Sequence, residues 1–141
     1  DTSKVTSMAG MFQNCSKLTS LDVSGWDTSS VTDMTSMFLG SAVTELDVSE
    51  WDTSKVTSAS SMFNNCYVQK ITMGPKFTLV GQLLSNTWYD NADGTCYTRA
   101  ELEALVRTDV RTYTTTKPET AAQSMSIMSN GNEISGYSVS E

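Results

Sequence analysis

The side chains that could do chemistry in this chain are three thiols, sixteen carboxylates and many hydroxyls, with no histidine among the 141 residues. A thiol such as that of Cys15, Cys66 or Cys96 becomes a nucleophile when a neighbouring base takes its proton. Histidine is the commonest such base and the commonest metal ligand, so its absence disfavours both nucleophilic catalysis and a transition-metal centre. We therefore expect a protein that is not an enzyme.

One stretch resembles a calcium loop at first sight, because Asp90, Asn91 and Asp93 precede Gly94. An EF-hand loop has glycine at its sixth position and oxygen ligands at its first and twelfth positions. With Gly94 as the sixth residue, the first would be Tyr89 and the twelfth Ala100, neither of which supplies a carboxylate. We expect no metal and no cofactor.

The charge balance is acidic, since nine Lys and Arg against sixteen Asp and Glu give a formal net charge of −7. Such a chain offers no basic stripe to a phosphate backbone, which makes nucleic acid and anionic membrane surfaces poor partners. No run approaches the roughly 18 apolar residues that span a bilayer. We expect no direct membrane insertion, with any signal or anchor outside this chain.

The first half of the chain repeats itself three times. The dipeptide Met-Phe begins at Met11, Met37 and Met62, so the copies are 26 and 25 residues apart. The stretch LTSLDVSGW in the first copy has the spacing of a leucine-rich repeat, with Trp26 where that pattern usually has Asn. A period of this length is typical of stacked repeats, because one unit alone cannot bury its apolar face.

Each copy contains two apolar patterns. Leu21 and Val23 alternate with polar residues, as do Leu46 and Val48, which predicts a short strand. The residues that follow in the second copy have helical spacing: Val31, Met34, Met37 and Phe38. We therefore expect an α/β repeat fold, a short right-handed leucine-rich-repeat-type solenoid with parallel strands and short helical returns, closed by a hairpin-helix-strand cap.

The corner of each repeat carries Trp-Asp-Thr-Ser, beginning at Trp26 and at Trp51. We expect the two tryptophans to stack, because equivalent residues of neighbouring repeats lie side by side. Asp27 and Asp52 are expected to accept backbone N–H groups where the chain turns. Both roles are architectural.

Three regions follow from these patterns. Residues 1–76 hold the three repeats of 25–26 residues, and residues 77–116 form a C-terminal cap. In the cap, TWYDNADGTCYT predicts a hairpin, and Thr98 with Glu101 fits a helix capping box. Residues 117–141 are interpreted as a linker followed by a possible hairpin at Asn130-Gly131 or the start of a further domain.

The three thiols are not expected to be catalytic. Cys15 and Cys66 are equivalent residues two repeats apart, which at about 4.8 Å a repeat puts them near 10 Å, too far for a disulfide. We expect them to be buried free thiols. A bridge between Cys66 and Cys96 stays open.

The outward face of the predicted strands is polar and is our candidate for ligand binding. Its residues are Ser20, Asp22, Ser24, Glu45, Asp47, Ser49, Lys70 and Thr72. A solvated sheet without a ligand is an equally good interpretation of the same residues.

The repeats LDVSGWDTSSVTDMTSMF and LDVSEWDTSKVTSASSMF resemble those of the BspA-like, DUF285 leucine-rich repeat proteins of bacterial surfaces. The resemblance implies a non-catalytic extracellular module, secreted or at the cell surface, that serves adhesion or binds a protein or glycan on a host or neighbouring cell. The alternative is a structural spacer or fibre component, possibly a virion decoration.

The first copy begins just after its missing Trp, which would leave Val5, Met8 and Phe12 at a raw end of the stack. Stacked repeats avoid such ends, because an uncovered repeat exposes apolar surface. We expect further repeats or another subunit to cover this end.

The apolar pattern generates a test of the core. Met37→Asp or Phe38→Asp should abolish cooperative unfolding, because each substitution buries an unpaired charge. Circular dichroism melting is the measurement, and a melting temperature within a degree of the parent's would mean that these residues face solvent.

Overall fold

The computed structural model describes residues 1–119, so the expected hairpin at Asn130-Gly131 lies outside the described residues. Five strands, one α-helix and one 3-10 helix are present in this part of the chain. They are β1 (Glu45–Val48), β2 (Lys70–Met73), η1 (Val80–Gln82), β3 (Thr87–Asp90), β4 (Cys96–Thr98), α1 (Arg99–Ala104) and β5 (Arg111–Thr114).

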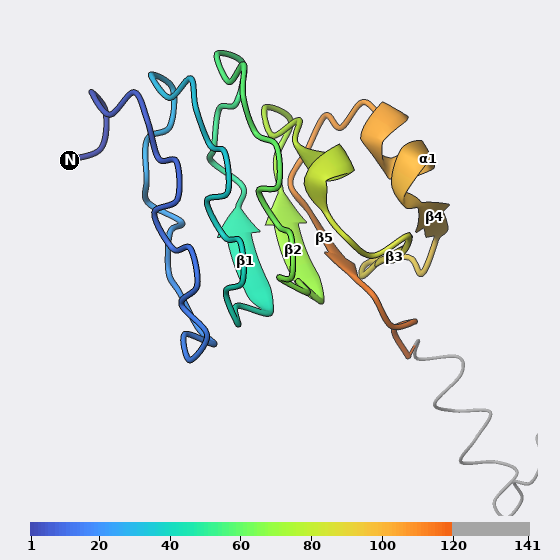
Figure 1. The fold of residues 1–141 in the computed structure, drawn as a ribbon. Helices are drawn as coiled ribbons and strands as arrows, with labels where there is room; N and C mark the ends of the chain where they lie inside the picture. The colour runs from blue at the N-terminus through green and yellow to red at the C-terminus, as the bar shows by residue number, and fades with distance from the viewer. Residues whose placement is uncertain (120–141) are drawn as a thin grey trace, which may run out of the picture.

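The strands form one mixed sheet in the order β1-β2-β5-β3-β4. β1 and β2 are equivalent segments of successive repeats and pair in parallel, with Leu46 opposite Ile71. β5 runs antiparallel between β2 and β3, and β3 pairs with β4 as a hairpin. The repeats follow one another from the N-terminus, and the cap with α1 lies at the opposite end of the molecule (Figure 1).

The expected solenoid with helical returns is wrong. The segments after each corner contain no helix, and residues 19–23 of the first copy are not a strand, so only β1 and β2 represent the predicted parallel strands. What the structure contains is a small five-stranded mixed sheet with little helix, beside which the three return segments are packed as chains of turns.

Backbone conformation explains why no helix forms. Two residues in each return segment have a positive φ at equivalent positions: Gly10 and Asn14, Ser36 and Gly40, Ser61 and Asn65. A left-handed residue at every fourth position breaks a right-handed helix, and glycine, asparagine and short polar residues tolerate that conformation best.

The hydrogen bonds of these segments run in two alternating directions. Met11 N–H donates to the carbonyl of Met8 three residues back, at 3.2 Å, which closes a turn. The next N–H, that of Phe12, donates to the carbonyl of Met37 in the neighbouring repeat at 2.8 Å. Phe38 N–H continues the lateral series to Met62 at 2.9 Å. Backbone donors that a helix would use internally therefore join one repeat to the next.

The predicted core residues are nevertheless buried. Val31, Met34, Met37 and Phe38 are all 0% exposed. Phe38 stacks between Phe12 and Phe63, with ring centroids 5.5 and 5.3 Å away. The expected stack of Trp26 on Trp51 is confirmed, with centroids 6.5 Å apart and planes inclined by 8°. Aromatic columns thus run through the repeats at both the return segment and the corner.

Threonine hydroxyls join the corners of successive repeats. The Thr28 hydroxyl donates to the Asp52 carbonyl and accepts the Asp52 N–H, both at 3.0 Å, and Thr2 makes the same pair of bonds to Asp27. Thr28 is fully buried, so its hydroxyl satisfies two backbone groups that water does not reach.

The aspartates of the corners close tight turns, as expected. Asp27 and Asp52 accept the N–H groups of Ser29 and Ser54, each at 2.9 Å. These bonds favour the ionised carboxylate, so the hydroxyl and N–H of Ser29 lower the pKa of Asp27, and those of Ser54 lower the pKa of Asp52.

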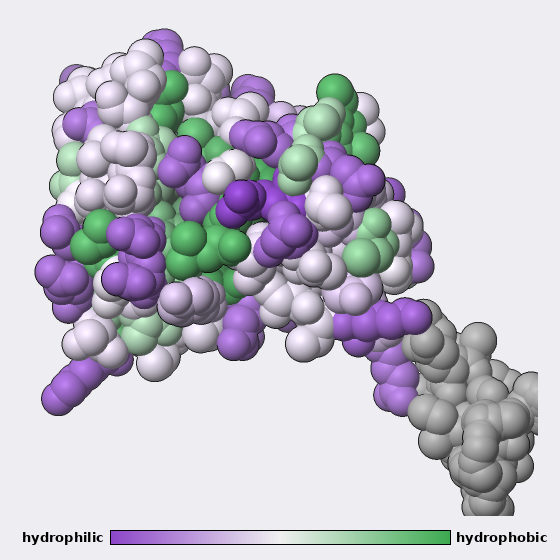
Figure 2. All heavy atoms as spheres, turned by 45° about the vertical axis from the view of Figure 1, so that its right-hand side comes forward, coloured by the Kyte–Doolittle hydropathy of each residue, from purple (hydrophilic) through white to green (hydrophobic). Residues whose placement is uncertain are grey.

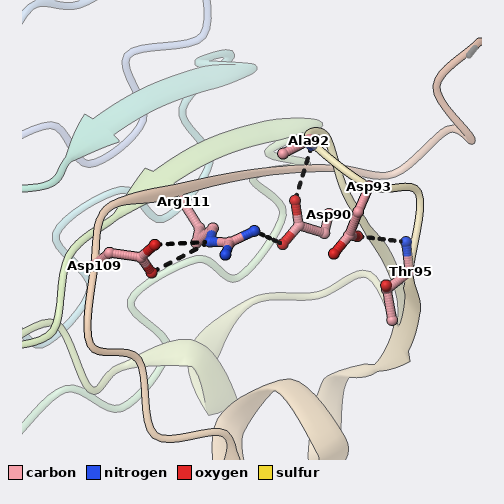
Figure 3. A network of polar contacts seen from close by, with 6 residues as sticks. All are labelled: Asp90, Ala92, Asp93, Thr95, Asp109 and Arg111. Carbon is pink, nitrogen blue, oxygen red and sulfur yellow. Dashed lines mark hydrogen bonds and ion pairs between the residues drawn. The ribbon is translucent and has the colours of Figure 1, made fainter. Parts of the chain in front are cut away.

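The cap contains the expected hairpin, β3–β4, and the capping box of α1 is formed. The Thr98 hydroxyl accepts Glu101 N–H at 3.1 Å, while the Glu101 carboxylate accepts Thr98 N–H at 2.8 Å. An ion pair between the half-buried Arg111 and the buried Asp90 ties the hairpin to β5, because Arg111 reaches the Asp90 carboxylate at 3.1 Å (Figure 3). Asp90 also accepts Ala92 N–H at the start of the turn.

The first repeat is less covered than the others. Met8 is buried, but Met11 is 42% exposed, and the described cap lies at the far end of the molecule (Figure 1). The expectation that further repeats or another subunit cover this end stays a prediction.

The left-handed positions generate a stability test. Gly40 has φ +72°, and a Cβ there would lie 2.6 Å from the Asn14 side-chain oxygen. Gly40→Ala should lower the free energy of unfolding by about 1–2 kcal/mol or more, because it adds a left-handed penalty to an overlap.

Gly25→Ala is the matched control, since a Cβ at Gly25 has nothing within 4 Å. It should change the free energy of unfolding by less than about 0.5 kcal/mol. Equal effects of both substitutions in urea titrations would contradict the proposed backbone constraint.

Candidate interaction surface

The outward side chains of β1 and β2 lie on one polar face of the sheet. Glu45, Asp47 and Lys70 are exposed, and Thr72 is half-buried. They project outward because strand side chains alternate between faces, so Leu46, Val48, Ile71 and Met73 fill the core instead. Ser20 and Asp22 of the first repeat are exposed beside β1, although their segment is not a strand. We call this surface, with its neighbours on β5 and β3, the polar face.

A groove of about 520 Å³ runs through the polar face. Six of the eight residues predicted from the sequence line it: Ser20, Asp22, Glu45, Asp47, Lys70 and Thr72. Leu21 and Leu46 add apolar surface between them. The groove therefore combines a partly apolar lining with carboxylates.

Ser24 and Ser49, the other two predicted residues, do not line the groove. They close turns instead, with the Ser24 hydroxyl donating to Asp22 at 2.6 Å and Ser49 N–H donating to Asp47 at 3.0 Å. The hydroxyl and the N–H of Ser24 lower the pKa of Asp22. Asp22 consequently stays ionised to a lower pH than an ordinary aspartate.

The carboxylates of the groove have no ion-pair partner within residues 1–119. The ion pairs of this part of the chain are those of Arg111 with Asp90 and Asp109, on the cap. Lys70 stands opposite Glu45 in the parallel register without forming an ion pair with it. The groove thus holds three carboxylates against one ammonium.

The sequence patterns missed the part of the polar face that β5 and β3 supply. Thr112 and Thr114 of β5 stand opposite Thr72 and Lys70, and the hydroxyls of Thr72 and Thr112 are 2.8 Å apart. Tyr89 of β3 comes next, opposite Thr114. The stretch VRTYTTT indicates a strand, but no local signal says that this strand pairs with β2.

Other hollows of the described surface are smaller, among them one of about 330 Å³ next to Ser41 and Tyr67. Apolar residues lie in small groups between hydrophilic ones on the side seen in Figure 2. Most of the large exposed apolar side chains belong to the cap, namely Leu84, Leu105, Val106 and Val110. A smaller cavity of about 210 Å³ lies next to them, around Arg107 and Arg111.

The carboxylates of the cap serve its own structure. The hydrogen bond and charge of Asp109, followed by the charge of Asp90, raise the pKa of Arg111 (Figure 3). Asp93 closes a turn by accepting Thr95 N–H at 2.9 Å, and that bond lowers the pKa of Asp93. Within residues 1–119, no group of three or more side chains is arranged to hold a metal ion.

All three cysteines are free, and no bridge joins Cys66 to Cys96. Cys66 is buried and its thiol lies 3.5 Å from the Val43 carbonyl, whereas Cys15 is half-buried and Cys96 is exposed. Burial raises the pKa of the Cys66 thiol to about 11, against the opposite effect of the Ser41 hydroxyl. The expected burial is therefore confirmed for Cys66 alone.

Comparison with known proteins identifies the family of this chain. Residues 1–74 match the family described as Mycoplasma protein of unknown function, DUF285. This is more than half of the chain, and the chain belongs to that family. The resemblance to DUF285 proteins is thereby confirmed, whereas the leucine-rich repeat geometry that it implied is not. No curated protein and no solved structure matches the chain. Among residues 1–119, no helix is long and apolar enough to cross a membrane.

The buried thiol generates a pH test. Because its pKa is raised above the ordinary value of 9.0, folding stabilises the protonated form, and this stability is complete below pH 9. It is lost as the pH rises from 9.0 toward about 11. Over this range the thiol of the unfolded chain ionises, while the thiol of the folded chain stays protonated.

Urea titrations at pH 8, 9.5 and 10.5 measure the effect. Cys66→Ser places in the third repeat the residue that Ser41 supplies in the second, and it should show a shallower loss of stability with pH than the parent. Parallel curves for the two proteins would show that the thiol is not buried in solution.

Proposed function

We propose that this chain is a non-catalytic interaction module that binds a protein or glycan ligand through the polar face. The observation that carries the proposal is the groove, because it lies where the repeat pattern alone placed a ligand-binding surface, and six of the predicted residues line it. A rigid sheet presenting polar side chains over a concave surface is a common design for recognition.

The arrangement of reactive groups supports binding rather than catalysis. The carboxylates of the groove are solvent-exposed, and a general acid or base usually has its pKa moved toward neutrality by burial. The pKa of Asp22 is instead lowered, by its hydrogen bonds to Ser24. The Cys66 thiol lies in the core, where burial raises its pKa and holds it in the unreactive protonated form.

We further propose that the module works outside the cell, at a bacterial surface or in secreted form, where it contributes to adhesion. This proposal rests on the resemblance of the repeats to those of surface proteins. The polar face, with its hydroxyls from Ser20, Thr72, Thr112 and Thr114, suits ligands that arrive from water, since such groups hydrogen-bond both protein and sugar.

An unbiased screen tests the function. The chain should be applied to arrays of glycans and of host proteins, and each ligand it captures should be tested again with Ser20→Trp, which fills the groove without a change of charge. We expect this variant to lose the captured ligand, because a large ring would occupy the space lined by Asp22 and Asp47.

Ser60→Trp is the matched control, because Ser60 is also exposed but lies on a return segment away from the groove. It should bind like the parent. Retention of the ligand by Ser20→Trp would exclude the groove as the binding site. Capture of nothing would favour the structural spacer, whose rigidity the aromatic columns would provide.

A further inference from the structure

We propose that the groove receives the guanidinium group of an arginine side chain on a partner polypeptide. The proposal rests on the proposed function, since it assumes that the polar face is the binding surface, and it goes further by naming the chemical group that is bound. Four observations lead to it, namely a gap between two repeats, free backbone acceptors, unpaired carboxylates and an apolar lining.

The groove is a gap between the first repeat and β1. The return segments of the first two repeats are joined by backbone bonds, for example Gly10 N–H to the Thr35 carbonyl at 2.9 Å. On the side of the sheet, no backbone hydrogen bond joins residues 18–24 to β1 in the described part of the chain. The two repeats therefore separate where the groove lies.

Both ends of the gap are held. At one end Ala42 N–H donates to the Cys15 carbonyl at 3.2 Å. At the other end the indole N–H of Trp51 donates to the Val23 carbonyl at 3.1 Å. The opening is thus part of the folded structure and not a frayed edge.

Backbone groups of β1 point into the gap. The Thr44 carbonyl accepts Lys70 N–H at 3.1 Å, so Thr44 directs its polar groups toward β2. Successive residues of a strand direct these groups to opposite sides, so Glu45 and Asp47 direct theirs toward the first repeat. Their carbonyls are acceptors, and their N–H groups are donors, without a backbone partner among the described residues.

The side chains of the gap select a cation with several donors. Asp22, Glu45 and Asp47 add carboxylate acceptors to the free carbonyls, and none of them has an ion-pair partner in residues 1–119. Guanidinium carries five N–H donors in a planar fork and forms charge-assisted bonds with carboxylates. The three carboxylates therefore make the gap complement guanidinium better than a neutral sugar hydroxyl.

The apolar lining suits the rest of an arginine side chain. Leu21 is half-buried and lines the groove together with Leu46. Arginine packs its methylene stem on apolar surface while its head reaches polar groups. A small cation would gain nothing from Leu21, so an arginine on a polypeptide is the better match.

The test uses a flexible probe peptide, Ac-Gly-Ser-Arg-Ser-Gly-amide, titrated into the isotopically labelled chain and followed by amide chemical shifts. Shifts should concentrate in residues 19–22 and 44–47. The same peptide with citrulline in place of arginine should bind at least about tenfold more weakly, because it keeps the shape but loses the charge.

Two protein variants locate the contact. Glu45→Gln with Asp47→Asn should weaken binding of the arginine peptide about tenfold. Glu50→Gln with Glu103→Gln removes the same charge from exposed residues outside the groove and should leave binding within about twofold. Lys70→Ala should strengthen binding about two- to threefold, because it removes the one cation among residues 1–119 that lines the groove.

Several outcomes would overturn the inference. Equal weakening by both double variants would mean attraction by net charge alone, and equal binding of a lysine peptide would mean that the planar fork is not recognised. Shifts spread over the whole surface, or no binding, would also refute it. The proposed function fails separately, since a ligand captured on the arrays and lost with Ser20→Trp would leave that function standing even if the arginine peptide does not bind.

Discussion

The lateral backbone hydrogen bonds between return segments are the constraint on which the rest of the structure depends. Phe12 and Phe38 donate their N–H groups to the next repeat, and this use of the backbone excludes a helix. It also sets the distance between repeats, which brings Phe12, Phe38 and Phe63 into one stacked column. The sheet is secondary to this arrangement, because β1 and β2 pair only where the repeats remain in contact.

Polar residues divide into two groups under this constraint. The corner aspartates and threonines, such as Asp52 and Thr28, form hydrogen bonds with backbone groups that would otherwise be unsatisfied. Glu45 and Lys70 have no such task. They project outward from β1, which pairs with β2 on one side, and from β2, which pairs with β1 and β5. A surface able to recognise something else therefore includes residues that folding leaves unused.

Local patterns in the sequence predict the repeat, the buried side of each repeat, the Trp26–Trp51 stack and the capping box at Thr98. These patterns fail at the return segments. Apolar residues three or four positions apart face inward in a helix, and they also face inward in a chain of turns that has a left-handed residue at every fourth position. Ser36 and Ser61 hide that conformation, since serine rarely adopts a positive φ. The place of β5 beside β2 is a contact between distant segments, and so the contribution of Thr112 to the polar face had no local signal.

The equivalence of the contacts between repeats has a consequence for how such chains change length during evolution. Thr2 holds Asp27 with the same pair of bonds that Thr28 makes to Asp52. A recombination event that joined Trp26 directly to Asp52 would delete residues 27–51 and would give Thr2 an identical partner. Duplication of residues 27–51 would instead insert another unit, about as thick as the 5.3 Å separation of the Phe38 and Phe63 rings. Genes of this type can gain or lose whole units while the aromatic column stays continuous, so the reach of the molecule is free to vary independently of the cap.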